Sequence, residues 1–184
     1  MAMNRLRAVL LLGAAFLAVF AQAACQGLRQ ALGAQVDLLP ALMVCAAMDA
    51  GLVTVALLAL CGGLWLDSLS ANPLGVSILP LFAVGLAVFA GRELLLRDQV
   101  FAQAVLGLGA SAAVPVLTLV VLLSTGHKPL LGWGSLWQWA VVSAGGAAAT
   151  PVCFIVLDWL HARLAHGRAH ESSFRLDREM RRGR

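Results

Sequence analysis

Long apolar runs, separated by short polar segments, constrain this chain more than any other feature of its sequence. A helix needs about 20 mostly apolar residues to cross a hydrocarbon core about 30 Å thick. Apolar residues make up 61% of the chain and charged residues only 12%, which is more apolar surface than a soluble domain of this size can bury. The sequence therefore predicts an all-α polytopic membrane protein, and its candidate spans are residues 8–24, 38–48, 51–66, 73–90, 104–123 and 139–157.

The second and third runs allow two interpretations, because Asp49 lies between them. Residues 38–48 alone are too few to cross a bilayer without tilting or shielding. Residues 38–66 form either one overlong span that contains Asp49 or two short helices joined by a tight turn at Asp49-Ala50-Gly51. The distribution of basic residues distinguishes the two, because Lys and Arg concentrate in cytoplasmic segments.

Six spans with a cytoplasmic start give the stronger charge bias. They place 11 of the 13 Lys and Arg on the cytoplasmic side, namely Arg5, Arg7, Arg92, Arg97, Arg163, Arg168, Arg175, Arg178, Arg181, Arg182 and Arg184. Only Arg29 and Lys128 fall outside, whereas five spans would move the Arg-rich tail outward. We therefore predict a six-transmembrane-helix bundle over 1–161, a basic cytoplasmic tail over 162–184, and both termini in the cytoplasm. The short second helix should be tilted or shielded by its neighbours. The tail is either a segment that binds anionic lipid or a cytoplasmic partner, or a disordered topology determinant.

The first run has an alternative interpretation as a secretory signal. Arg5 and Arg7 precede an apolar stretch that ends in the small-residue segment Ala21-Gln22-Ala23. Its apolar length exceeds the usual upper limit of about 15 residues for such signals, so we favour a retained first helix. Cleavage would leave the topology of the remaining spans unchanged.

Prolines and small residues predict close packing inside the bundle. Proline leaves a helical carbonyl without its donor, and the apolar runs contain Pro40, Pro80, Pro115 and Pro151. We expect nearby hydroxyl groups to satisfy some of these carbonyls, and the candidates are Ser77, Ser111 and Thr150. Gly107 and Ser111, four residues apart, and the small residues at 143–148 should let helix backbones approach closely. Trp133, Trp137 and Trp139 mark the expected outer start of the sixth helix.

The densest motif lies between the third and fourth spans. Gly62-Gly63-Leu64-Trp65-Leu66-Asp67 ends one helix, and Asn72-Pro73-Leu74-Gly75 is expected to cap and start the next. Asp67 has two interpretations. An ionisable residue at this depth is a functional candidate, but its carboxylate could instead accept hydrogen bonds from backbone N–H groups of the following turn.

The order of these motifs resembles the bacterial rod-shape-determining membrane protein MreD. The residues that carry this resemblance are the basic first helix, Asp37-Leu38-Leu39-Pro40, the Gly62–Asp67 and Asn72–Gly75 motifs, and Arg92-Glu93-Leu94-Leu95-Leu96-Arg97. The resemblance spans most of residues 1–125, is strongest over 37–98, and is weak in the sixth helix and tail.

The resemblance implies a non-enzymatic membrane scaffold or regulator of the cell-elongation machinery in the bacterial inner membrane. It implies an MreC-like bitopic partner, with an MreB-like cytoskeleton and a glycan polymerase–transpeptidase pair acting indirectly. It also implies a fold similar to the substrate-binding subunit of energy-coupling-factor transporters. The structural or partner-interaction candidates are Asp67, Asn72, Pro73, Gly75, Gly62, Gly63, Asp37, Pro40, Arg92 and Glu93.

The residues offer little chemistry beyond this. We expect no cofactor and no catalytic group, because no phosphate loop, nucleophile motif or paired carboxylates at a usable separation occur. A metal at His161, His166 and His170, or a cation between Asp37 and Asp67, is only weakly indicated. The alternative function is a substrate-binding subunit of a vitamin-type transporter, because proline-interrupted helices can line a binding site.

Overall fold

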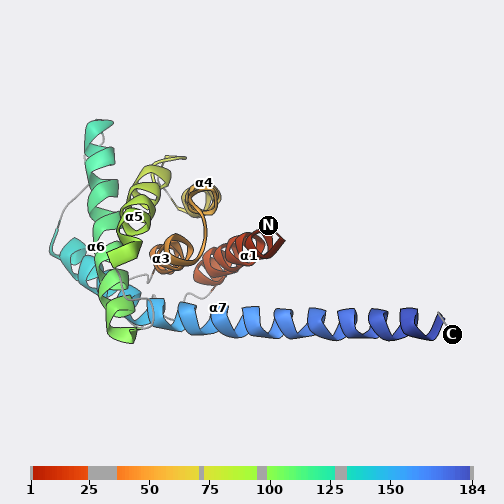
Figure 1. Cartoon of the computed structure of the whole chain (residues 1–184). Coiled ribbons are helices and arrows are strands. Elements are labelled where there is room, and N and C mark those ends of the chain that lie inside the picture. The colour runs from red at the N-terminus through yellow and green to blue at the C-terminus, as the bar shows by residue number, and fades with distance from the viewer. Residues whose placement is uncertain (1, 25–36, 71–72, 95–98, 127–131, 183–184) are drawn as a thin grey trace. The chain divides into compact units, whose positions relative to one another are not determined.

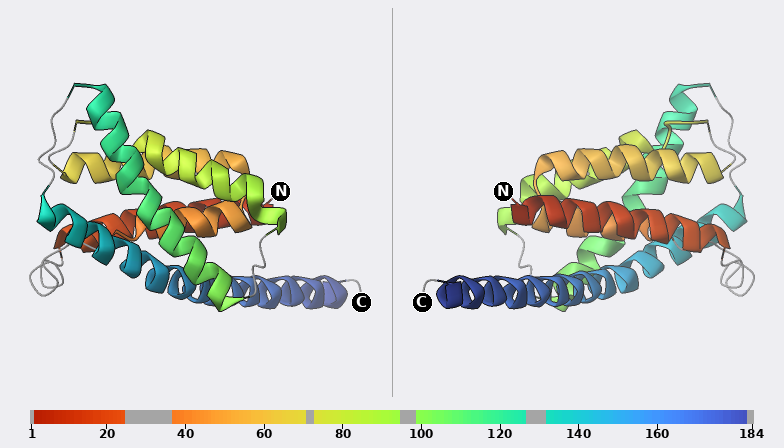
Figure 2. Two further views of the ribbon diagram at one scale, coloured as in Figure 1. Left: turned by 90° about the vertical axis from the view of Figure 1, so that its left-hand side faces the viewer. Right: turned by 90° about the vertical axis from the view of Figure 1, so that its right-hand side faces the viewer.

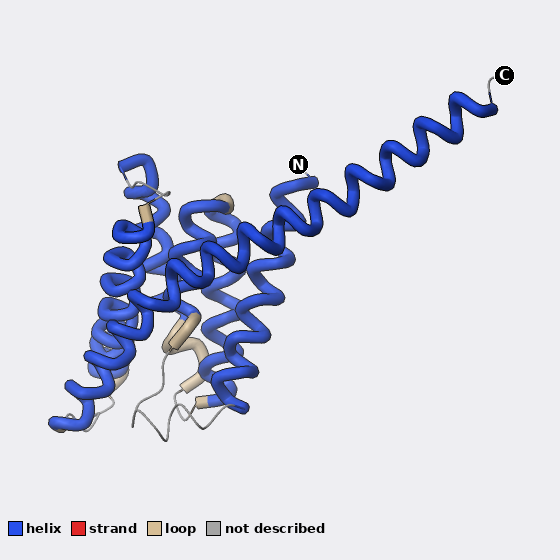
Figure 3. Tube along the Cα trace, turned by 90° about the horizontal axis from the view of Figure 1, so that it is seen from below, coloured by secondary structure: helices blue, strands red, loops and turns tan. Residues whose placement is uncertain are grey.

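The structure is a computed structural model that describes residues 2–24, 37–70, 73–94, 99–126 and 132–182. These residues form helices, turns and loops, and no strand occurs among them (Figures 1 and 3). The predicted all-α class is confirmed, and each predicted apolar run lies largely within one of the helices α1 (Ala2–Ala24), α3 (Leu39–Asp49), α4 (Leu52–Leu69), α5 (Ile78–Gly91), α6 (Val100–Ser124) and α7 (Trp133–Arg182).

Three of these helices contain segments that are long and apolar enough to cross a membrane. They are Leu52–Leu69, Val100–Ser124 and Trp133–Leu160. The remaining apolar helices are shorter, at 10–17 residues, and comprise Ala8–Gln22, Leu39–Asp49 and Ile78–Gly91. This helical composition makes the chain a membrane protein.

Helix α3 lies at the centre of the bundle. It contacts α1, α4, α5 and α6, and nine of its residues are buried. A helix that is apolar on every face is stable where other helices surround it, which accounts for the burial of α3. The predicted shielding of this helix is therefore confirmed. Helix α6 runs obliquely across its neighbours (Figure 2).

The chain breaks between α3 and α4, as the turn interpretation predicted. Helix α3 ends at Asp49, and α4 begins at Leu52 after extended backbone at Ala50 and Gly51. The carbonyl of Gly51 then accepts hydrogen bonds from the N–H groups of Thr54 and Val55. The single overlong span over 38–66 is wrong, because two residues leave the helical conformation at this point.

The chain divides into two compact units, Met1–Cys153 and Phe154–Arg184. The first unit contains helices α1 to α6 and the start of α7. Helix α7 has 50 residues, and a helix of that length measures about 75 Å, well beyond the thickness of a hydrocarbon core. The charged tail over 162–182 is helical, and its guanidinium at Arg163 stacks over the ring of Trp159 at 4.9 Å.

Small residues bring α6 and the start of α7 into close contact within the first unit. A Cβ atom on Gly107 would lie 2.5 Å from the carbonyl oxygen of Gly146, and one on Gly146 would lie 2.9 Å from the carbonyl oxygen of Gly107. Ser111 and Thr150 pack at the same crossing, and both are fully buried. The predicted close approach of helix backbones is thus confirmed at these residues.

We expected three hydroxyl groups to satisfy the helical carbonyls that the prolines leave without a donor, and this prediction is wrong for all three. Ser77 Oγ donates to the carboxylate of Asp67, Thr150 Oγ1 donates to the carbonyl of Gly146 at 2.8 Å, and Ser111 Oγ is buried without a hydrogen-bond partner. Pro40 and Pro80 instead lie in the first turns of α3 and α5, where helical N–H groups have no partner in any case.

Candidate functional site

The Asp67 carboxylate at the end of α4 is the most heavily hydrogen-bonded side chain of the predicted motif. Its Oδ2 accepts the N–H of Gly75 at 2.7 Å and the N–H of Ser77 at 3.2 Å, and its Oδ1 accepts the hydroxyl of Ser77. Asp67 and Ser77 are buried. The carboxylate thus binds the backbone of the turn that follows α4, which was the structural interpretation of this residue.

This hydrogen bonding shifts the start of the next helix. Residues 74–77 form turns, and α5 begins at Ile78, so the predicted helix start at Pro73 is wrong. Gly75 has φ +94°, a conformation that breaks the helix and that glycine adopts without a Cβ clash. The N–H groups of Gly75 and Ser77 both donate to the Asp67 carboxylate. In a helix starting at Pro73 they would point along the helix axis instead.

Gly62 and Gly63 let the starts of two other helices approach α4. A Cβ on Gly62 would lie 2.6 Å from Leu39 Cδ2, at the start of α3. A Cβ on Gly63 would lie 2.9 Å from Ile78 Cγ1 and 3.0 Å from the Ile78 nitrogen, at the start of α5. The glycine pair therefore joins α3 and α5 to the same end of α4.

Asp37 lies just before the start of α3, at this end of the bundle, and its side chain binds the first residue of the helix. Its Oδ1 accepts the N–H of Leu39 at 3.0 Å, and Pro40 follows within the first turn. Burial raises the pKa of the Asp37 carboxyl above its ordinary value. The hydrogen bond from Leu39 acts in the opposite direction and lowers the pKa by less. The weak indication of a cation between Asp37 and Asp67 gains no support, because each carboxylate accepts protein N–H groups instead.

Five of the ten predicted candidates meet at one end of α4, namely Asp37, Gly62, Gly63, Asp67 and Gly75, whereas Arg92 and Glu93 do not. Arg92 and Glu93 follow the far end of α5 in a short 3-10 turn, where the Arg92 guanidinium stacks over Phe89 at 4.2 Å. Asn72 and Arg97 lie outside the described residues. The residues that meet, which we call the α4 joint, are Asp37, Leu39, Gly62, Gly63, Asp67, Gly75, Ser77 and Ile78.

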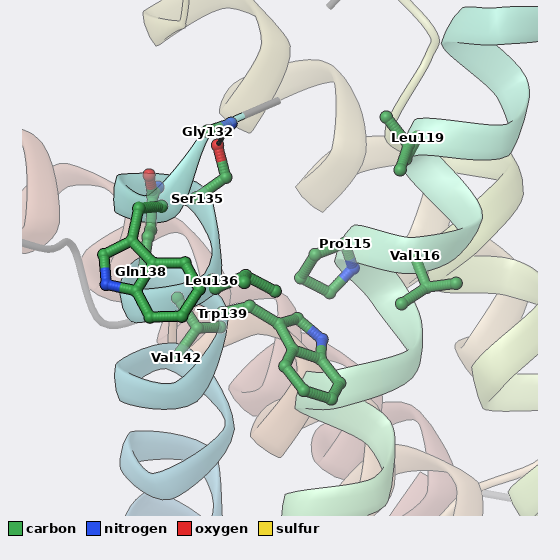
Figure 4. Close-up of a pocket in the computed structure, with 10 residues that line it drawn as sticks. Pro115, Val116, Leu119, Gly132, Ser135, Leu136, Gln138, Trp139 and Val142 are labelled. Carbon is green, nitrogen blue, oxygen red and sulfur yellow. Dashed lines mark hydrogen bonds between the residues drawn. The ribbon is translucent and has the colours of Figure 1, made fainter. Parts of the chain in front are cut away.

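A groove between α6 and the start of α7 was not predicted. It has a volume of about 700 Å³, and Figure 4 shows Pro115, Val116 and Leu119 of α6 opposite the side chains of Leu136 and Trp139 of α7. Its remaining lining residues are Gly132, Trp133, Ser135, Gln138 and Val142. This volume falls within the range of about 300–1,000 Å³ that is typical of small-molecule sites.

Trp139 fixes one wall of this groove. Its indole Nε1 donates to the carbonyl of Ala112 at 3.0 Å, which joins α7 to α6. That carbonyl lies one residue after Ser111, whose own carbonyl loses its helical donor at Pro115. The proline and the tryptophan were recognised separately in the sequence, as a helix interruption and as an interface marker. Only their pairing across two helices reveals the groove.

No family model, no curated protein and no solved structure matches this chain.

Proposed function

We propose that this chain is a non-enzymatic scaffold or regulator of a bacterial cell-elongation complex in the inner membrane, as its resemblance to the MreD family implies. The observation that carries the proposal is the α4 joint. Part of the motif set on which the resemblance rests holds α3, α4 and α5 together, through the Asp67 carboxylate and the Gly62-Gly63 contacts. The Asp67 carboxylate accepts donors of this chain, and these contacts support a structural role for the motif.

A six-span topology with both termini in the cytoplasm belongs to this proposal. The three shorter apolar helices would then cross the bilayer inside the bundle, with α3 screened from lipid by its neighbours. The basic residues of the tail would lie on the cytoplasmic side, in accord with the bias of Lys and Arg in membrane proteins.

The docking surface for a partner should differ from the small-residue surface at Gly107 and Gly146. These residues pack against each other within the chain, so they are not free to receive a partner's helix. Exposed apolar side chains on α4 and α1 are among the candidates, for example Val53, Leu60, Phe16 and Phe20. Trp65, next to these, contacts the ring of Phe16 edge-on at 5.2 Å.

Affinity purification from the native membrane tests the proposal. We expect the tagged wild-type chain in mild detergent to retain an MreC-like bitopic protein, together with the wall-synthesis enzymes. The Asp67→Ala variant should insert into the membrane normally, but the amount of partner recovered with it should be about tenfold lower than with the wild type, because the α4 joint loosens. Ser68→Ala is the control, since Ser68 is exposed and its hydroxyl only contacts the Trp65 carbonyl. Recovery of a transporter ATPase module in place of these partners would contradict the proposal.

The groove between α6 and α7 favours a second candidate function. A cavity of about 700 Å³ is large enough for a small apolar ligand, as a substrate-binding transporter subunit would require. A stoichiometric small molecule other than a membrane lipid in the purified protein would support this candidate over the scaffold.

A further inference from the structure

The groove between α6 and α7 lies directly beside the small-residue crossing of these helices. The two backbones meet at Gly107 and Gly146, and Val142 is the last residue of α7 that lines the groove before the crossing. The first turns of α7, which precede Val142, are poorly covered: Trp133 is 87% exposed and Leu136 is 57% exposed. The gap between the helices is therefore open on the apolar surface of a membrane protein, and in a bilayer another molecule must fill it.

The chemistry of the lining favours an uncharged, amphipathic occupant. None of the ten lining residues is ionisable. The side chains toward the crossing are apolar, at Pro115, Trp139 and Val142, whereas the polar side chains Ser135 and Gln138 lie in the first turns of α7. A ligand that fits has an apolar body along the groove and polar groups beside the start of α7.

The groove extends along α7 from its first turns to the helix crossing. Lining residues on α7 run from Gly132 to Val142, and ten residues of helix rise about 15 Å. The tryptophans at the start of α7 are residues that favour the headgroup level, so the polar end of the groove lies where lipid headgroups begin.

A partner's transmembrane helix is a poorer fit than a flexible chain. Helices in membranes pack through small residues that allow close backbone approach, and the small residues of α6 and α7 are already engaged with each other at Gly107 and Gly146. The groove walls are instead formed by large, irregular side chains, among them Leu119, Leu136 and Trp139. An unbranched acyl chain adapts to such a surface by rotation about its own bonds.

We propose that this groove is a lipid-binding site that holds one acyl chain of a membrane phospholipid, with the ester and headgroup region beside Ser135 and Gln138 at the start of α7. Binding relies on dispersion contacts that fill the gap, because lipid tails and apolar side chains gain no hydrophobic energy from each other inside a bilayer. The site does not depend on the proposed cell-elongation function.

Photochemical labelling tests this site. The full-length chain would be reconstituted in nanodiscs with a phosphatidylcholine that carries a diazirine near the end of one acyl chain. Irradiation and peptide mass spectrometry would then map the adducts. Because the chain end would lie beside the helix crossing, we expect adducts to concentrate about tenfold on residues 115–116 and 139–142 relative to lipid-facing residues elsewhere, such as Val53 on α4 and Leu79 on α5. Uniform labelling of all exposed apolar residues would overturn the proposal.

A matched pair of variants distinguishes the groove from general lipid contact. Val116 lines the groove, while Val120 lies one turn further on the same helix, is comparably exposed and does not line it. Val116→Trp should reduce labelling of 139–142 about tenfold, whereas Val120→Trp should leave it unchanged. Equal labelling in both variants would contradict the site. The distribution of labelled residues in the wild-type protein tests the site even if neither variant folds.

Competition identifies any other occupant. If a soluble small molecule or a copurifying membrane protein abolishes labelling of the groove in the wild-type chain, the groove belongs to that ligand or partner and the lipid proposal is wrong. If unlabelled phosphatidylcholine alone competes, the proposal stands. Loss of the cell-elongation partners without loss of groove labelling would contradict only the proposed function.

Discussion

The Asp67 carboxylate accepts the backbone N–H of Gly75 at 2.7 Å, across the turn that joins α4 to α5. The same oxygen accepts the N–H of Ser77, and the other oxygen accepts its hydroxyl. A single buried carboxylate therefore satisfies three donors in a segment where the backbone is not helical. Because buried donors without partners destabilise a protein, this residue should matter more for stability than its exposed neighbours do.

Asp67→Ala should lower the free energy of unfolding by about 3 kcal/mol, because it leaves buried donors at Gly75 and Ser77 without an acceptor. Asp67→Asn should cost less, since the amide oxygen can accept the two N–H groups and the Ser77 hydroxyl can turn to accept from the amide. Thermal unfolding in detergent measures both. Equal losses for the two variants would show that charge rather than hydrogen bonding is decisive.

Gly107→Ala should destabilise the chain by about 2 kcal/mol, because its Cβ would lie 2.5 Å from the carbonyl oxygen of Gly146 and would force α6 and α7 apart. Gly109→Ala on the same helix is the matched control. No atom lies within 4 Å of a Cβ there, so it should be neutral or more stable by up to about 1 kcal/mol. Similar unfolding temperatures for the two variants would contradict the close crossing.

Trp139→Phe should lower stability by about 0.6 kcal/mol, the typical value of a side-chain hydrogen bond within a membrane bundle. The variant keeps an aromatic ring in the groove but removes the Nε1 donor to the Ala112 carbonyl. Trp133→Phe, at a side chain that is 87% exposed, provides the control and should change stability little. Chemical unfolding of the two variants side by side measures the difference.

Asp37 should make stability depend on pH. Burial raises the pKa of its carboxyl in the folded chain above the ordinary value of 3.8, so ionisation disfavours the folded state. The contribution of Asp37 to stability is therefore fully present below pH 3.8 and is lost as pH rises through the raised pKa.

Asp37→Asn tests this pH dependence, because an amide oxygen can still accept the Leu39 N–H but does not titrate. The variant should be more stable than the wild type near about pH 7, and the difference should shrink as pH falls toward about 4. Unfolding temperatures across this pH range check both statements. A constant difference between the two proteins would assign the effect to packing instead.

The sequence by itself determined the helical class, the approximate bounds of each apolar helix and the break at Ala50 and Gly51. The helical class and the bounds follow from local composition, because a run of apolar residues acts through the nearest neighbours in the chain. The Asp-Ala-Gly segment allows a break, and the distribution of Lys and Arg along the whole chain favours it over a single long span. The sequence also indicated that small residues at 107, 111 and 146 let helices meet.

Only the tertiary structure decided how these elements are joined. The start of α5 moved from Pro73 to Ile78 because a carboxylate several residues earlier captures the N–H groups of Gly75 and Ser77. The groove arises because Pro115 and Trp139, 24 positions apart in sequence, lie on two helices that separate beyond the Gly107–Gly146 crossing. Hydrogen bonds and gaps between distant segments depend on where whole helices pack, and no local pattern of residues encodes that placement.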